Sequence, residues 1–397
     1  MPYSLAVLSY HPMPYHVAFY RALHQEPRIT ETILYLDDFG VREQFDPEFN
    51  QKLTWDNDIL AGYNYKFFKN FTWNPFKAPF GRINPGIFFE IAFSHYDAVL
   101  LDYATVSTWF AYTAAQLTHR LVIMRAEADL DKPYKSKWSQ LKERFLSTWL
   151  NHCDAVMYSC EKNRQYFKAF GVTDDKLFPI LSSVDNAYYH SLLTSRLQLR
   201  TTQRQKYNLP PEAIVAIFSG RLIERKKPLD LLAAYKKIIT QQPNLWLVYI
   251  GDGPLRETIE QEARQANLDQ VICVGFRNQS ELPAHYMMAD FFVMPSEWDP
   301  TPKALNEAVV CGLPSIVSTG IGQANDLIIN AVNGLVFEVG NIEQLAQALL
   351  TLSQDPALRE KFSQQLQVTA AEWCPEKNVA GVVAALEYAL DKNNHCP

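Results

Sequence analysis

Two loops of the chain carry charged residues that suit the binding of a phosphorylated molecule. Arg221 and Lys226 stand in SGRLIERKK, directly after the apolar run 214–218. A forked guanidinium and a compact ammonium on one loop can together neutralise a diphosphate. Asp299 and Glu307 bracket the start of an amphipathic stretch, where their carboxylates can accept hydrogen bonds from hydroxyls. These four residues, our candidate catalytic group, predict a site for a sugar nucleotide.

The stretch between the two carboxylates begins as a helix whose first turn can bind an anion. Thr301 is predicted to cap this helix and Pro302 to take its first position, where a missing N–H costs little. The amides of Lys303, Ala304 and Leu305 would then point beyond the preceding strand, where the helix dipole favours negative charge. A polar loop before an ordinary amphipathic helix gives the same local pattern, so that alternative stays open here.

Glycine-containing turns end the neighbouring apolar runs. Gly220 permits a close backbone approach to a ligand. Gly251 and Gly253 form the turn GDGP, and Phe276 with Arg277 follows another glycine. Ligands of doubly wound sheets bind beyond the carboxyl ends of the strands. Together with the stretch around Asp299, four successive strands would therefore deliver polar or glycine-rich loops to one edge of one sheet.

Apolar runs alternate with helical stretches along the whole chain, which predicts an α/β protein of doubly wound architecture. A length of 397 residues favours two domains. We expect domains at 1–200 and 201–375, a C-terminal helix at 376–397 returning to the first domain, and a polar linker at 191–211. The expected strands are 5–9, 33–36, 98–101, 121–124, 155–158, 177–181, 214–218, 245–250, 271–274, 291–294 and 315–318.

Composition excludes several classes of protein. The formal net charge is -6, without the broad basic field that nucleic-acid binding requires. The six cysteines show no metal-ligand spacing and favour reduced thiols in the cytosol. The first residues lack the pattern of a signal peptide, and no apolar run approaches the length of a membrane span. We therefore expect a cytoplasmic protein without a metal site or cofactor.

Three other segments allow a functional interpretation beside a simpler one. The aromatic stretch 55–80 contains interleaved lysines, which is typical of base stacking or of a membrane interface, but a loop packed on its domain is favoured. The basic amphipathic stretch 135–152 would suit an anionic membrane surface or an ordinary helix covering a sheet. Asp129 and Asp131 form a DxD pair, which we interpret as capping charge rather than as a metal ligand.

The order of these motifs resembles a known family. SGRL with Lys226, IGDGP, VGF, PSxxD with a following acid, GLP at 312–314 and NGLV at 333–336 resemble the C-terminal half of the retaining GT-B glycosyltransferases of family 4, also called glycosyl transferases group 1. The resemblance covers about residues 214 to 350. It implies two Rossmann-like domains facing across a cleft that holds a nucleotide-diphosphate sugar.

That resemblance also implies roles for individual residues. Arg221 and Lys226 would bind the diphosphate, Glu307 the ribose, and the backbone near Phe276 and Arg277 the base. Asp299 stands where the family has a glutamate that contacts the donor sugar. The implied reaction needs no metal and moves a sugar from a UDP- or GDP-sugar to a glycan or lipid-linked acceptor.

Several positions depart from the family pattern. Asp299 is one methylene shorter than glutamate, and Pro302 replaces a glycine and removes an amide. His11 and His16 stand where the family has a glycine-rich first loop, and the histidine of its N-terminal cleft has no match. His11, His16, Arg125 and Glu127 are therefore candidates for that cleft. A same-fold epimerase or phosphorylase, a non-catalytic nucleotide-sugar binder, and peripheral contact with a membrane surface remain alternatives.

Overall fold

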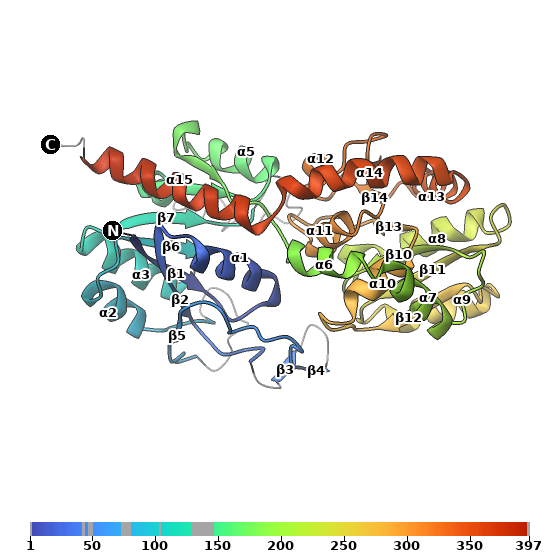
Figure 1. Ribbon diagram of the computed structural model, residues 1–397, viewed down its shortest axis with the longest axis horizontal. Coiled ribbons are helices and arrows are strands. Elements are labelled where there is room, and N and C mark those ends of the chain that lie inside the picture. The colour runs from blue at the N-terminus through green and yellow to red at the C-terminus, as the bar shows by residue number, and fades with distance from the viewer. Residues whose placement is uncertain are drawn as a thin grey trace. The chain divides into compact units, whose positions relative to one another are not determined.

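The computed structural model describes residues 2–41, 44–46, 51–72, 81–102, 105–128, 130 and 147–394. The chain forms two compact units (Figure 1). The N-terminal unit comprises Met1–Gln44, Leu53–Leu181 and Cys374–Pro397, and the C-terminal unit comprises Phe45–Lys52 and Ser182–Trp373. A short pair of strands, β3 (Gln44–Asp46) and β4 (Gln51–Leu53), stands apart from the two large sheets.

The N-terminal unit is built on a seven-stranded parallel sheet in the order β5-β2-β1-β6-β7-β8-β9. Its strands are β1 (Tyr3–Ser9), β2 (Ile29–Tyr35), β5 (Tyr65–Phe67), β6 (Ala98–Asp102), β7 (Leu121–Arg125), β8 (Ala155–Tyr158) and β9 (Leu177–Pro179). Its helices are α1 (Pro14–Gln25), α2 (Gly86–Phe93), α3 (Val106–Leu117), α5 (Glu161–Ala169) and α15 (Pro375–Asn394), with a 3-10 turn at Asp174–Lys176.

The central strands β6 and β7 are buried on both faces, which explains why they are nearly continuous apolar runs, whereas the edge strand β5 is exposed. Alternate residues of β1 enter different cores because successive side chains of a strand point to opposite faces. Leu5 and Val7 pack with α1 and α15, whereas Ala6 and Leu8 pack with α2, α3 and α5. The C-terminal helix α15 thus packs beside α1 within the N-terminal unit (Figure 1).

The C-terminal unit contains a six-stranded parallel sheet in the order β12-β11-β10-β13-β14-β15. Its strands are β10 (Ile214–Ser219), β11 (Leu245–Ile250), β12 (Val271–Gly275), β13 (Phe291–Met294), β14 (Ser315–Ser318) and β15 (Gly334–Phe337). Its helices are α6 (Asn186–Leu193), α7 (Arg196–Lys206), α8 (Pro228–Ile238), α9 (Arg256–Gln265), α10 (Leu282–Met288), α11 (Lys303–Val310), α12 (Ala324–Leu327), α13 (Ile342–Gln354) and α14 (Pro356–Glu372). A 3-10 turn at Glu224–Lys226 precedes α8.

The structure corrects two expectations about local structure. The segment 191–211, predicted as a polar linker, lies within the C-terminal unit, and residues 196–206 form α7. Arg200 and Arg204 of that helix both bind Asp290, so their charges are paired rather than solvated. The aromatic stretch contains β5, which pairs with β2 and was predicted as a loop.

Some of the expected features fall outside the described residues. Lys77, Asp129, Asp131 and most of the stretch 135–152 are not described. In the described part of the chain, no helix is long and apolar enough to cross a membrane. The described cysteines, which exclude Cys396, are free.

Candidate functional site

The charged residues predicted from the sequence lie beyond the carboxyl ends of β10 and β13. These two strands are parallel neighbours, and β10 separates β11 on one side from β13 on the other. The strand order therefore reverses at β10, which is where doubly wound sheets bind ligands. Arg221 and Lys226 follow β10, and Asp299 follows β13. Glu307 lies in α11, the helix that follows β13.

Lys226 and Asp299 form an ion pair between the two loops. The Lys226 ammonium donates to Oδ2 of Asp299, and Arg225 Nη1 lies 3.9 Å from the other carboxylate oxygen. The two paired side chains are only 11% and 12% exposed. Burial lowers the pKa of Lys226, Asp299 partly offsets this effect, and the charges of Arg225 and Arg221 lower the pKa further. The pair is thus held in a site that is poor in water and rich in positive charge.

Further contacts fix the loop after β10 to the loop after β13. The Arg225 guanidinium donates to the Trp298 carbonyl and lies 5.4 Å from the centre of the indole ring. The amide of Glu297 donates to the Arg225 carbonyl over 2.8 Å. Lys227 forms an ion pair of 3.3 Å with Glu297 and has a φ of 51°, which turns the chain into α8. The two loops therefore present their charges as one unit.

Close backbone packing explains two of the glycines near this site. A Cβ atom at Gly251 would lie 2.0 Å from the Gly220 carbonyl oxygen, so a side chain there would push the first two glycine turns apart. A Cβ atom at Gly320 would lie 2.2 Å from the Glu297 carbonyl oxygen. The Gly320 carbonyl accepts from the Asp299 amide over 3.0 Å, which fixes the backbone of that acid. The sequence reasoning missed the loop containing Gly320, although its TGIG sequence directly follows a predicted strand.

The start of α11 differs from the predicted geometry. The helix begins at Lys303, and Pro302 is the N-cap residue because its ψ of 118° is extended. Thr301 therefore lies one position too early to cap the helix. The Leu305 amide donates to the Pro302 carbonyl over 3.2 Å, so it cannot bind an anion as predicted. Ala304 lies in the first turn, and its carbonyl accepts from the Tyr286 hydroxyl over 3.3 Å.

Glu307 is buried and held by a tyrosine that the sequence reasoning missed. Its residue exposure is 3%, and its Oε2 accepts from the Tyr286 hydroxyl over 2.7 Å. Burial raises the pKa of Glu307, while Tyr286, Tyr189 and the charge of Lys303 partly offset that rise. Lys303, one helical turn earlier, donates to the Ser182 hydroxyl over 2.6 Å. No motif marked either tyrosine, because only the packing of α6 and α10 on α11 brings them to the acid.

The residues predicted to meet a base lie farther along the same sheet edge. Phe276 and Arg277 follow β12, the outermost strand on that side. Arg277 Nη1 donates to the Phe276 carbonyl over 2.9 Å, and its Nε lies 3.9 Å from Glu281. Gly253 lies in the loop after β11, the strand between β12 and β10, and so stands between these residues and Arg221 along the sheet edge. All the predicted loops of the C-terminal unit thus reach one edge of its sheet.

The N-terminal candidates all lie in their own unit. His11 follows β1, and its Nδ1 lies 3.7 Å from Asp37 and 3.3 Å from Nη2 of Arg82. Burial lowers the pKa of His11 to about 4, against the opposing charge of Asp37. His11 is therefore a neutral imidazole at pH 7.

His16 and Arg125 are both near Tyr20, on which the charge of Arg125 acts. His16 is buried in α1, 3.4 Å from the Tyr20 hydroxyl. Arg125 ends β7 and donates to Glu127 over 3.3 Å. Across the residues that the structure describes, no three His, Cys, Asp or Glu side chains gather closely enough to hold a metal ion.

Comparisons with known proteins agree with this architecture. Residues 200–368 match the family model described as glycosyl transferases group 1. The UDP-Gal:alpha-D-GlcNAc-diphosphoundecaprenol alpha-1,3-galactosyltransferase of Escherichia coli is 33% identical over 154 residues, which are 38% of this chain and 39% of that protein. Alignments with eight curated relatives span between 37% and 66% of those proteins' own length.

Solved structures share the fold over nearly the whole chain. Anabaena HepE, solved in complex with UDP-glucose, has a TM-score of 0.71 and 17% identity, with 96% of this chain and 99% of that chain covered. A glycosyltransferase from Rickettsia africae has a TM-score of 0.73 and 15% identity, with 98% and 99% covered. The predicted class of two Rossmann-like units in the GT-B arrangement of elements is confirmed.

Proposed function

We propose that this protein, whose residues 200–368 match the family model described as glycosyl transferases group 1, transfers a sugar from a nucleotide-diphosphate sugar to a glycan or lipid-linked acceptor with retention of the anomeric configuration. The observation that carries the proposal is the meeting of Lys226 and Asp299 beside the start of α11, at the point where the strand order reverses. Arg221 on the same loop and Glu307 on α11 complete the group.

The cations on the β10 loop would stabilise the leaving group. Breaking the bond between the anomeric carbon and the phosphate oxygen leaves both electrons on the diphosphate and positive charge on the sugar. Arg221 and Lys226 would balance that new negative charge, and positioned cations act strongly where water is excluded. An acceptor hydroxyl would then attack from the same face and give its proton to the departing phosphate oxygen.

The Lys226–Asp299 pair suggests how the donor would enter. In the structure, each charge is the other's partner, so neither is buried alone. A diphosphate would compete for Lys226, and the released carboxylate of Asp299 could accept from a sugar hydroxyl. Binding would thus exchange one ion pair for two charge-assisted contacts. The shorter side chain of Asp299 would place the sugar nearer to the β13 loop than a glutamate would.

Glu307 would bind a ribose without moving. Tyr286 holds one carboxylate oxygen, and a carboxylate can accept several hydrogen bonds at once. Ribose hydroxyls would therefore find an acceptor whose rotamer is already fixed. This pre-organisation reduces the entropy cost of donor binding.

Donor binding is the first test of this proposal. Thermal unfolding is measured with UDP, GDP and ADP and with their glucose or galactose conjugates, each with and without EDTA. UDP is tried first because the relatives above are named for UDP-Gal or were solved with UDP-glucose. A ligand at 100 times its Kd adds about 2.7 kcal/mol to the free energy of unfolding. No stabilisation by any nucleotide would overturn the proposal.

A pair of arginine variants locates the binding. Arg221→Gln should remove most of the stabilisation by the nucleotide, because it deletes a guanidinium from the predicted diphosphate site. Arg264→Gln is the matched control, since Arg264 is exposed on α9, a helix outside this group of residues. Equal effects of the two variants would show that general charge, rather than the predicted site, attracts the nucleotide.

A further inference from the structure

A second charged pocket lies at the opposite edge of the C-terminal sheet from the residues described above. Its volume is about 290 Å³. Asp290 directly precedes β13 and Pro314 directly precedes β14, so the pocket adjoins the amino ends of these strands. The candidate catalytic residues follow the carboxyl ends. The side chains that matter here are Arg196 and Arg200 of α7, Asp290, and Arg359 and Glu360 of α14.

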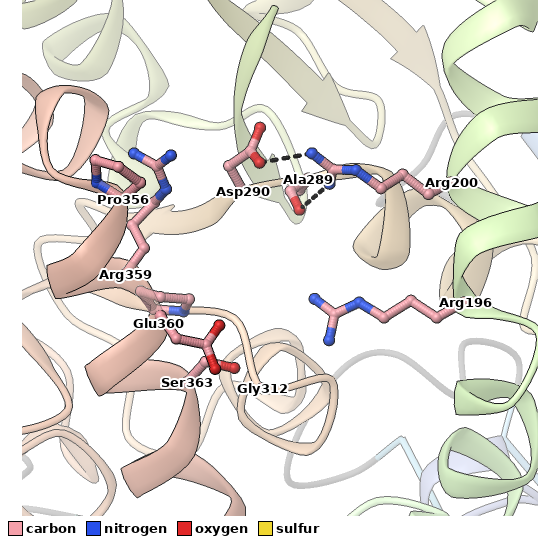
Figure 2. A pocket seen from close by; sticks show the side chains of 10 residues that line it. Arg196, Arg200, Ala289, Asp290, Gly312, Pro356, Arg359, Glu360 and Ser363 are labelled. Atoms are coloured by element: carbon pink, nitrogen blue, oxygen red, sulfur yellow. Dashed lines mark hydrogen bonds and ion pairs between the residues drawn. The ribbon is translucent and has the colours of Figure 1, made fainter. Parts of the chain in front are cut away.

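Arg196 is a half-buried cation that has no protein partner among the described residues. It forms no hydrogen bond or ion pair with any residue that the structure describes, and Figure 2 shows its guanidinium extended from α7 into the open space of the pocket. Its charge acts on the buried Cys311 at the end of α11, where it lowers the thiol pKa against the rise caused by burial. An arginine placed in this way is suited to a planar anion.

Arg200 is fixed by the protein and retains donors toward the pocket. Its Nη1 donates to the carbonyls of Met288 and Ala289 over 3.0 and 2.9 Å, and its Nη2 donates to Asp290 over 2.6 Å. Figure 2 draws the contacts with Ala289 and Asp290. Arg204, outside the pocket lining, also binds Asp290 over 2.7 Å. Asp290 is therefore shared by two guanidiniums and does not cancel the charge of the pocket.

Arg359 supplies a third guanidinium from the facing helix. Its Nη1 donates to the carbonyls of Leu352 and Ser353 near the end of α13, which orients the group. Its Nε and Nη2 have no bond to any described residue. The α14 N-terminus itself offers less, because the Asp355 side chain already accepts from the Leu358 amide over 2.8 Å. The donors of this pocket are thus guanidiniums rather than helix amides.

One carboxylate opposes these charges. Glu360 is exposed and accepts from Gln364 over 3.0 Å, without an ion-pair partner in the part of the chain that the structure describes. Arg204, from outside the pocket lining, neutralises the charge of Asp290. The three guanidiniums of the lining are then opposed only by the carboxylate of Glu360 among the described lining residues. The remaining charge suits a single small anion. The pocket volume is at the lower end of the range for small-molecule sites, which favours a small ligand.

We propose that this pocket binds a small phosphate-bearing molecule, either inorganic phosphate or a sugar monophosphate. Arg196 contacts the phosphate oxygens directly, and Arg200 and Arg359 complete the cradle from two helices. The site is separate from the proposed donor site, because the length of β13 separates the two edges of the sheet by about 10 to 13 Å. The pocket and the proposed donor site share no residue.

Isothermal titration calorimetry of the full chain tests this proposal. The ligands are inorganic phosphate, glucose 1-phosphate and glucose 6-phosphate, with chloride as the background anion. Arg196→Gln should weaken phosphate binding by about tenfold or more, since it removes a charge-assisted contact. Glu360→Gln should tighten binding because it removes the opposing charge. Tighter binding of one sugar phosphate than of inorganic phosphate identifies the monoester as the ligand, and the reverse order identifies the free ion.

Two variants separate this site from the donor site. Arg264→Gln, on exposed α9, is the matched control and should bind phosphate as the unmodified protein does. In Arg221→Gln, at the other edge of the sheet, the saturable site that Arg196→Gln weakens should remain. Phosphate binding that survives Arg196→Gln but is lost in Arg221→Gln would overturn the proposal and place the anion in the donor site. Absence of saturable binding to the unmodified protein would also overturn it. Because Arg196 makes no structural bond to the described residues, its variant should unfold at an unchanged temperature.

Discussion

Replacing either member of the Lys226–Asp299 pair should destabilise the C-terminal unit, but by unequal amounts. Breaking a buried ion pair costs about 3 to 5 kcal/mol when the remaining charge has no other partner. Here the two side chains keep 11% and 12% exposure, which places the cost at the lower end of that range. The surroundings of each charge then decide which variant is worse.

The remaining neighbours favour the aspartate. In Lys226→Met, the Asp299 carboxylate keeps Arg225, whose Nη1 is already 3.9 Å away, so we expect a loss of about 1 to 2 kcal/mol. In Asp299→Asn, the buried ammonium faces the like charges of Arg225 and Arg221, so we expect about 3 kcal/mol. The double variant should lose about 2 kcal/mol less than the sum of the two single losses, because its second substitution breaks no remaining pair.

Urea unfolding at pH 7 measures these differences. The midpoint and slope are compared for the parent, the two single variants and the double variant. Raising the salt concentration should change the losses little, because buried charges are weakly screened. Additive losses, or a larger loss in Lys226→Met than in Asp299→Asn, would refute the reasoning.

Three further predictions concern single side chains. Tyr286→Phe removes a hydrogen bond to the charged form of Glu307 and should lower the free energy of unfolding by about 2 kcal/mol. Because the pKa of Glu307 then rises further above 4.5, urea unfolding should show a larger loss of stability at pH 7.5 than at pH 5. Equal losses at the two pH values would contradict this role of Tyr286. The pKa of His11 is about 4 in the folded protein, below the usual 6.5, so the folded state binds fewer protons than the unfolded state and the free energy of unfolding falls by about 3 kcal/mol between pH 6.5 and pH 4. His11→Gln should flatten that part of the plot of stability against pH. An unchanged plot would show that His11 is not the source of the pH dependence. Gly251→Ala should lower the free energy of unfolding in urea by about 3 kcal/mol, because the new Cβ would clash with the Gly220 carbonyl and the residue has a φ of 129°. A loss below 1 kcal/mol would show that the two loops can move apart.

The strands of the C-terminal unit were readable from the sequence because both faces of its sheet are buried. A strand buried on both faces is a continuous apolar run, and the runs at 245–250, 291–294 and 315–318 match β11, β13 and β14 residue for residue. β15 was not predicted as a strand, since its four residues begin with a glycine and two of them are only partly buried. The order of the strands, with β10 between β11 and β13, follows from the doubly wound pattern.

The partners of the site residues were not readable, because they come from distant parts of the chain. Lys226 and Asp299 are 73 residues apart, and no periodic pattern connects them. Tyr286 reaches Glu307 only because α10 packs beside α11. The helix start was misjudged by one residue because Thr301 and Pro302 both suit an N-terminus, and only the backbone angles decide which residue caps it.

The central claim is that the cations after β10 stabilise the leaving group of a nucleotide sugar. Proton NMR of the anomeric region, recorded while the protein consumes an α-linked UDP-sugar, tests it most directly. The account predicts that the first product has the α configuration, and that Arg221→Gln lowers turnover by about a hundredfold or more at an unchanged unfolding temperature. Full turnover in Arg221→Gln would contradict the central claim, and a β product would contradict the proposed retention of configuration.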